Sequence, residues 1–350
     1  MVMLFLLAVL AVICSCERSQ IDNFDWECET ANHNLDRNLN NLGLDNSIVI
    51  TFNNEDELII DNPYENEISI ALNEGNVIVQ NLSFGTEYNL VVGGTTENGS
   101  LKIYGNQKMG LYLNGVNIAN PNGPAINIQN RQKMSIHLVN GTENYLADGS
   151  SYGISGEDAK GTFFSEAPIY FFGCGALAVV GKYAHAIAVD NDFEIGSGII
   201  TVVEAARDGI HANGDIYARG GNIYIASSGE GIQSENSSVH ISGGKTAIKT
   251  TGIKSHGIKA NNNMEISDGV LIIRTSGADS KGINVDGNLT VTGGDIKINA
   301  IDDGIKVHGN LLINAGNFCV WSLKKQNIDC VGTETIKEGT VNNGSCAIGF

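Results

Sequence analysis

The sequence predicts an all-β protein folded as a parallel β-helix, and three observations predict it. A Gly-Ile pair begins at Gly209, Gly231, Gly257, Gly282 and Gly304, at intervals of 22, 26, 25 and 22 residues. Each interval holds short segments of alternating apolar and polar residues, separated by turns rich in glycine, asparagine or aspartate. The same apolar residue type also returns at the same place in successive intervals. These features are typical of a β-solenoid, whose coils pair through parallel strands about 4.8 Å apart.

Two rows of inward-facing side chains follow from this repeat. The first row is Ile210, Ile232, Ile258, Ile283 and Ile305. The second row is Ile225, Ile248, Ile273, Ile298 and Val320. An antiparallel β-sandwich also has alternating strands, but it would not require one apolar residue type at the same place in every unit.

Composition and charge agree with a turn-rich β protein. The chain of 350 residues contains 43 glycines and only 4 prolines, and central strands accept proline poorly. The net charge is −18, and residues 17–100 carry 16 acidic and 2 basic residues. This charge excludes nucleic acid as an expected partner.

The N-terminus predicts export from a bacterial cell. Residues 1–16 form an apolar run that is too short to span a bilayer and has the length of a signal peptide. Ser15 before Cys16 resembles a lipoprotein cleavage box, so we expect lipidation of Cys16 and a lipid anchor in the membrane. A plain secretory signal is the alternative, because the run lacks lysine and arginine and Cys14 is unusual there. Either reading predicts a cell-envelope protein, anchored at the outer membrane or cell surface, or a secreted one.

The remaining chain divides into four predicted segments. Residues 17–44 are a flexible tether, 45–105 an N-terminal β cap with the first strands, 106–322 the parallel β-helix, and 323–350 a C-terminal cap. An insertion of low periodicity interrupts the helix at about residues 146–160. A disulfide of Cys330 with Cys346 or Cys319 is one option for the C-terminal cap, and Cys174 is expected to be a small core or turn residue.

Several runs resemble a known family. The runs Leu113-Asn114-Gly115-Val116-Asn117-Ile118 and Asp208-Gly209-Ile210-His211-Ala212-Asn213 are similar to those of bacterial carbohydrate-binding domain-containing proteins. These are secreted or lipid-anchored parallel β-helices, right-handed and single-stranded, with a pectate-lyase-like fold, and the resemblance covers roughly residues 45–320. It implies binding of plant cell-wall or acidic polysaccharides, calcium bound in the turns, and no established catalysis.

One outward strand face is the predicted carbohydrate-binding surface. Aromatic rings can stack on sugars, and basic side chains can pair with uronate carboxylates. The residues expected to line this face are Tyr224, Lys249, Arg274, Lys297 and Trp321. The alternative is that solvent-facing strand positions simply tolerate such residues.

Acidic residues at the turns are the predicted calcium ligands, because Ca²⁺ prefers carboxylate and carbonyl oxygens. They are Asp208, Glu230, Asp279, Asp302 and Asp303. The sequence contains no EF-hand loop, and stacked opposite charges that neutralise one another are the alternative reading. The 7 histidines are scattered, and no pair has the spacing of a zinc site.

The sequence therefore predicts a non-catalytic, monomeric, calcium-binding protein of the cell envelope that binds polysaccharide. One alternative is a surface adhesin or structural solenoid that binds protein. Another is a calcium-dependent polysaccharide lyase, with a base near Asp279 chosen from Lys254, His256, Lys259, Arg274 and Lys281. A glycoside hydrolase would instead use Glu230 with Asp208 or Glu235.

Overall fold

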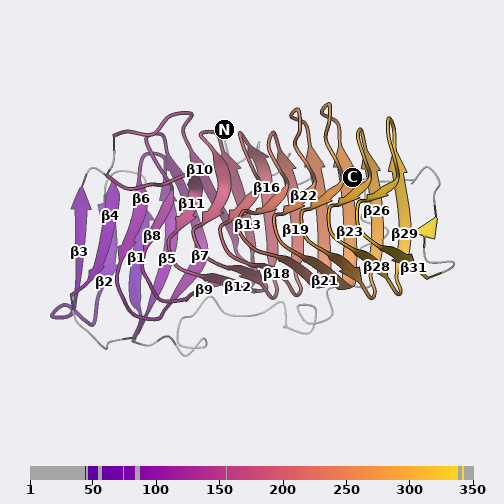
Figure 1. Cartoon of the computed structure of the whole chain (residues 1–350). Coiled ribbons are helices and arrows are strands. Elements are labelled where there is room, and N and C mark those ends of the chain that lie inside the picture. The colour runs from indigo at the N-terminus through magenta and orange to yellow at the C-terminus, as the bar shows by residue number, and fades with distance from the viewer. Residues whose placement is uncertain are drawn as a thin grey trace.

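The computed structural model describes residues 44, 46–53, 57–73, 75–82, 87–154, 156–337 and 341–342. Over these residues the chain is built from strands that stack into one elongated body, with β3 at one end and β29 and β31 at the other (Figure 1). In the described part of the chain no helix is long and apolar enough to cross a membrane. The proposed signal peptide with Cys16, and almost all of the predicted tether, lie outside the described residues.

The described strands form two sheets, one of 20 and one of 12 strands. The 12-stranded sheet contains β3 (Ile68–Asn73), β4 (Asn76–Asn81), β6 (Ser100–Tyr104), β8 (Ile126–Gln129), β11 (Gly161–Ser165), β14 (His185–Val189), β17 (Ile210–Ala212), β20 (Ile232–Ser234), β22 (Ile258–Ala260), β24 (Ile283–Val285), β27 (Ile305–Val307) and β30 (Ile328–Cys330).

The 20-stranded sheet contains β1 (Ile48–Asn53), β2 (Glu57–Asp61), β5 (Tyr88–Thr96), β7 (Met109–Asn120), β9 (Met134–Leu138), β10 (Glu143–Asp148), β12 (Ile169–Gly173), β13 (Ala176–Gly181), β15 (Phe193–Ile195), β16 (Ile199–Ala205), β18 (Ile216–Ala218), β19 (Asn222–Ser227), β21 (Val239–Thr250), β23 (Met264–Thr275), β25 (Leu289–Val291), β26 (Asp295–Ala300), β28 (Leu311–Ile313), β29 (Asn317–Ser322), β31 (Glu334–Ile336) and β32 (Val341–Asn342).

Each coil of the central region uses three strand segments, one in the smaller sheet and two in the larger. In one coil these are β17, β18 and β19, and they pair in parallel with β20 and with the two halves of the long strand β21 in the next coil. Among the described strands, antiparallel pairing occurs at β1–β2 and β3–β4. The predicted parallel β-helix is therefore confirmed, and the sandwich alternative is excluded.

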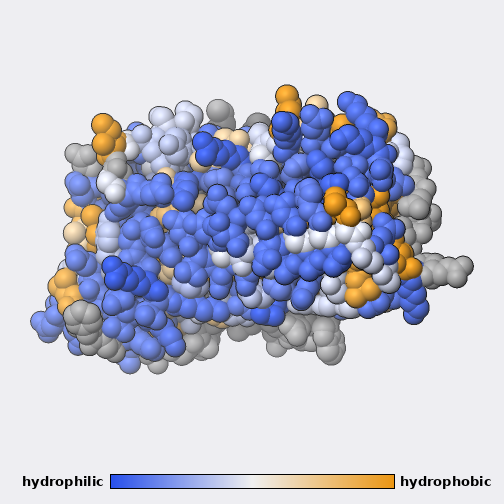
Figure 2. Space-filling view, viewed as in Figure 1, coloured by the Kyte–Doolittle hydropathy of each residue, from blue (hydrophilic) through white to orange (hydrophobic). Residues whose placement is uncertain are grey.

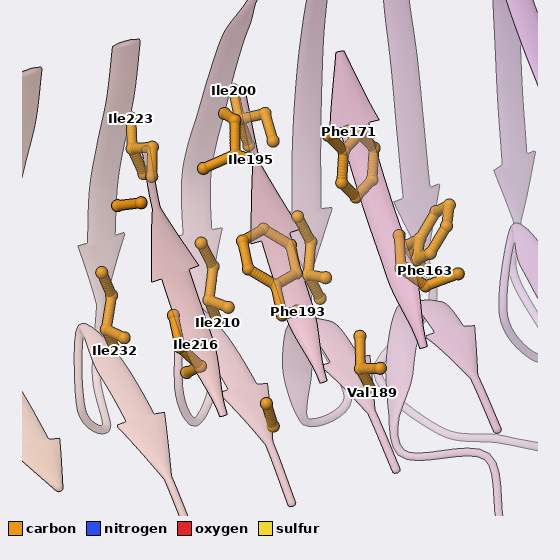
Figure 3. Close-up of a cluster of buried hydrophobic side chains, with 14 of the residues drawn as sticks. Phe163, Phe171, Val189, Phe193, Ile195, Ile200, Ile210, Ile216, Ile223 and Ile232 are labelled. Atoms are coloured by element: carbon orange, nitrogen blue, oxygen red, sulfur yellow. The ribbon is translucent and has the colours of Figure 1, made fainter. Parts of the chain in front are cut away.

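The two predicted inward rows are confirmed by the strand register. Ile210 pairs with Ile232, and the row continues coil by coil through Ile305. The second row runs in register from Ile225 to Val320. Figure 3 shows Ile210 and Ile232 on neighbouring strands of this core. Because these side chains are fully or almost fully buried, each contributes on the order of 1.5–3 kcal/mol to folding.

The shape that the coils share explains why glycine precedes each isoleucine of the first row. A Cβ atom on Gly257 would lie 2.3 Å from Cγ2 of Ile273 and 2.6 Å from the carbonyl oxygen of Gly282. The backbone of the smaller sheet therefore runs directly against the second isoleucine row. The Gly-Ile pair is thus one packing unit, in which the glycine admits a side chain from the opposite wall.

The helix extends past both bounds that the sequence suggested. Parallel pairing already begins at β1–β5 and β4–β6, before residue 106, and β2 and β3 are the strands added in antiparallel fashion at that end. At the other end, β30, β31 and β32 pair in parallel beyond residue 322. The polar sequence there still folds as a coil because its backbone pairs with the coil before it.

The structure corrects the predicted cysteine chemistry. Cys174 and Cys319 each take part in a disulfide bond, whereas Cys330 is a free thiol and Cys346 lies outside the described residues. Cys330 lies opposite Val307 in the strand register and packs against the hydrophobic core. It therefore continues an apolar row of the helix, which is why it is not available for the disulfide considered from the sequence.

Candidate functional site

A cleft of about 550 Å³ lies on the outer side of the 12-stranded sheet, near the N-terminal end of the helix. Its floor includes Ile78 of β4, Lys102 of β6 and Asn127 of β8, which are consecutive partners in the strand register. One wall of the cleft comes from the 146–160 insertion. The sequence identified this insertion only as a break in the periodicity, so its contribution to a cleft was not predicted.

Glu157 fixes the insertion to the floor of the cleft. Its carboxylate accepts hydrogen bonds from the Tyr104 hydroxyl and from Nδ2 of Asn127, the latter at 2.5 Å, and lies 3.4 Å from Nζ of Lys102. Burial acts to raise the pKa of Glu157, but these hydrogen bonds and the lysine charge outweigh it and lower the pKa. Burial and the Glu157 carboxylate together raise the pKa of Tyr104 to about 12.

Two stacked tyrosines stand at the cleft. The rings of Tyr152 and Tyr183 are 4.0 Å apart between centroids, and Tyr183 is 44 % exposed. Asp148 positions both segments, because its buried carboxylate accepts the Tyr152 hydroxyl at 2.7 Å and the Lys182 backbone N–H at 2.6 Å. Burial raises the pKa of Asp148 despite these hydrogen bonds. The result is an aromatic surface supported by a rigid polar anchor.

Asparagine side chains and backbone amides complete the cleft. Asn120 donates from Nδ2 to the Pro124 carbonyl at 2.7 Å and accepts the backbone N–H of Asn122 at 3.0 Å. The backbone N–H of Gly153 donates to the Asn122 carbonyl at 2.9 Å, which joins the insertion to the turn after β7. The same cleft is also lined by Asn73 and Asn98. An aromatic surface beside many amides is suited to sugar hydroxyls and sugar ring faces.

The strand face predicted to bind carbohydrate is split by the register. Tyr224 and Lys297 belong to one outward row, whose residues come directly before the inward isoleucines in the chain. The other three residues belong to a second outward row, whose residues come directly after the inward positions in the chain. They are Lys249, Arg274 and Trp321. A single row of all five is therefore wrong, because residues on both sides of each inward isoleucine point outward. Tyr224 also carries a lysine near its ring, with Nζ of Lys245 5.6 Å from the centroid.

The predicted calcium ligands lie in different coils. Asp208 and Glu230 are neighbours, with the Glu230 backbone N–H donating to Oδ1 of Asp208 at 3.0 Å. Burial and the charge of Asp208 raise the pKa of Glu230 to about 7. Several coils away, the carboxylate of Asp302 lies 3.1 Å from Nζ of Lys281 and 2.9 Å from Nζ of Lys325.

The two other predicted ligands are similarly placed near the C-terminal coils. Asp303 accepts the Gln326 backbone N–H at 3.2 Å, and Asp279 has a positive φ of 57° at its turn. The candidate lyase bases are also dispersed, since Arg274 is in β23 of the larger sheet while Lys259 is in β22 of the smaller one.

Two histidines converge on Asp208. Nδ1 of His185 is 3.2 Å and Nδ1 of His211 is 2.9 Å from Oδ2 of Asp208, and the two rings stack with centroids 4.3 Å apart. All three side chains are buried. Spacing along the chain did not indicate this group, because the coil repeat, rather than a short motif, brings residues 23 and 26 positions apart together.

Comparison with known proteins agrees with the fold and defines the class to which the chain belongs, a family of carbohydrate-binding domain-containing proteins. The model of the carbohydrate-binding domain-containing protein family matches residues 73–324 and 276–348. The chain therefore belongs to this family. A family member from Acetivibrio thermocellus is 35 % identical over 95 residues, which are 26 % of this chain and 33 % of that protein. The match thus spans about a third of the relative's length.

A solved structure supports the same fold. The polysaccharide lyase-like protein from C. thermocellum, solved as a gadolinium derivative, superposes with a TM-score of 0.52 and 24 % sequence identity. The superposition covers 84 % of this chain and 98 % of that one. It establishes the shared β-helix architecture.

Proposed function

We propose that the protein binds polysaccharide without cleaving it, and that the cleft between the 146–160 insertion and the 12-stranded sheet holds the glycan. The observation that carries this proposal is the stacked pair Tyr152 and Tyr183 beside an amide-lined floor. Aromatic rings bind the apolar faces of sugars, and the amides offer donors and acceptors to the hydroxyls. The surface in Figure 2 is hydrophilic over most of its visible area, as expected of a protein that works beside a hydrated polymer.

The charges of the cleft favour a neutral plant-type glycan. Its ionisable groups include Lys102, Glu157 and Asp158, and Lys102 already pairs with Glu157. Asp158 in turn lies 3.4 Å from Nζ of Lys160, so both lysines are already paired with acids and an acidic glycan would need a bridging cation. Calcium would supply that bridge, since it binds carboxylates of both partners.

Replacing Tyr183 with alanine is expected to weaken glycan binding about tenfold. A stacked aromatic ring contributes roughly 1.4 kcal/mol, and this energy corresponds to a factor of ten in the dissociation constant. The measurement is retention of the protein on insoluble β-glucan and on immobilised polygalacturonate, with calcium and with chelator. The matched control is the double variant Tyr224→Ala, Trp321→Ala, which changes the strand face and leaves the cleft intact.

The outcomes separate the candidate functions. Loss of retention in the control variant alone would move the glycan to the strand face. Unsaturated sugars in the supernatant would identify a lyase. If no glycan retained the protein, the carbohydrate proposal would be rejected in favour of a protein-binding solenoid.

Calcium is proposed as a structural or bridging ion of the native protein. Free calcium at 100 times its dissociation constant should then raise the free energy of unfolding by about 2.7 kcal/mol, since a ligand of the native state stabilises that state. The measurement is a thermal melt of metal-depleted protein with and without calcium. Asp279→Asn and Asp303→Asn, compared in the same assay, would locate the ion. An unchanged melting temperature would argue against calcium.

A further inference from the structure

The buried group of His185, Asp208 and His211 occupies two successive coils. Asp208 precedes β17 in the same place that His185 occupies at the start of β14, and His211 is the middle residue of β17. Their exposed fractions are 6 %, 4 % and 7 %. One ligand atom from each residue lies within 4.8 Å of the other two. The group is separate from the cleft, since none of its members lines that cavity.

The surroundings of the group bring three ligand atoms close together. Oδ1 of Asp208 accepts the Glu230 backbone N–H, so Oδ2 is left facing the imidazoles. Nδ1 of His185 lies 3.3 Å from the backbone nitrogen of Asp208 and 3.2 Å from its Oδ2. Either a proton or a metal ion between Nδ1 and Oδ2 would remove the repulsion between their lone pairs.

Glu235 orients the third ligand. Its Oε2 lies 3.3 Å from Nε2 of His211, so the proton of a neutral His211 is drawn to Nε2 and the lone pair of Nδ1 points at Asp208. A carboxylate that holds the far nitrogen of a histidine is the usual outer partner of a metal-bound imidazole. In the metal-free protein, a proton on Nδ1 of His211 would take the place of the metal.

We propose that His185, Asp208 and His211 bind one divalent transition-metal ion of the zinc class. Two imidazole nitrogens and one carboxylate oxygen suit Zn²⁺, whereas Ca²⁺ prefers oxygen ligands alone. Ligands of a tetrahedral zinc ion are about 3.3 Å apart, given zinc–ligand distances near 2.0–2.1 Å. The separations of 2.9 and 3.2 Å from Asp208 are close to this value, and all three ligand atoms lie within 4.8 Å of one another, so rotation of the imidazoles would complete the site. The ion would join two coils of the helix.

The test is zinc binding by metal-depleted full-length protein, measured by calorimetry and by melting temperature. We expect one Zn²⁺ per chain, a higher melting temperature with zinc, and visible d–d absorption when Co²⁺ replaces it. His185→Gln and His211→Gln should abolish binding, and Glu235→Gln should weaken it about 10–100-fold. The matched control is His240→Gln, because His240 also faces a carboxylate, that of Glu265 at 3.3 Å, but on the surface.

Each result decides the proposal. Zinc binding that is unchanged in both histidine variants, or no zinc binding by the wild type, would overturn it. Melting curves of all variants in chelator identify any that fail to fold, and Glu235→Gln, which changes no ligand, keeps the test valid in that case. Glycan retention should be the same in all of these variants, so failure here is separate from failure of the polysaccharide proposal.

Discussion

Gly257→Ala is expected to lower the free energy of unfolding by about 2–3 kcal/mol, because overpacking a tight interior forces side chains and backbone to move. The new methyl group would lie 2.3 Å from Ile273 and 2.6 Å from the carbonyl oxygen of Gly282. The second contact is with backbone that holds the next coil, so rotation of one side chain cannot relieve it. The measurement is the midpoint of urea unfolding at constant slope.

Gly156→Ala is the control for this prediction. An added Cβ at Gly156 has no neighbouring atom within 4 Å, so its effect should stay within about 0.5 kcal/mol. Equal midpoints for the two variants would contradict the view that the Gly-Ile pair is a packing unit.

His256 is expected to make the fold less stable as the pH falls from 7 to 5. Burial, together with the charges of Lys281 and Lys259, lowers the pKa of His256 to about 4, although Asp302 acts in the opposite direction. Nδ1 of His256 accepts the Lys281 backbone N–H at 3.0 Å, and protonation of this nitrogen would remove that acceptor. The folded protein therefore holds this histidine neutral.

The sign follows from the two pKa values. The unfolded chain takes up the proton near pH 6.5, well before the folded chain does near 4, so acid favours unfolding across that window. Between pH 7 and pH 5 the histidine should cost about 2 kcal/mol of stability. His256→Gln should flatten the pH dependence of urea unfolding by that amount. A variant that kept the full slope would show that other groups cause it.

The sequence predicted the parallel β-helix because the residues of its core recur at regular intervals along the chain. Each coil must cover the one before it, so the same apolar residue recurs at the same place in each repeat. In the structure Ile258 accordingly faces Ile232 and Ile283. The family resemblance was confirmed over most of the chain. The ends were predicted less well, because at β30 and β31 backbone pairing continues after the apolar pattern has faded.

The sites were harder to predict than the fold. Tyr152 and Tyr183 meet only because an irregular insertion folds back over the sheet, and no periodic rule fixes where such a segment goes. His185 and His211 meet because they lie in neighbouring coils that stack side by side, which brings residues 26 positions apart together without any short motif. The presence of two tyrosines and several acids in or near the aperiodic segment was the one available signal of the cleft.

The glycine that precedes each isoleucine has a consequence for how proteins of this kind change in length. Each coil repeats the same contact between its two walls, a glycine against a branched side chain, as at Gly231 with Ile248 and Gly282 with Ile298. Each of these glycines also lies against the glycine carbonyl oxygen of the next coil, Gly257 and Gly304 respectively. One coil can therefore follow another without a new junction having to evolve. Duplication or loss of a whole coil is the mutation that this architecture tolerates best. The cleft and the histidine group meet at the turn before β14, where Tyr183 lines the cleft and His185 begins the strand, so loss of that coil would remove parts of both.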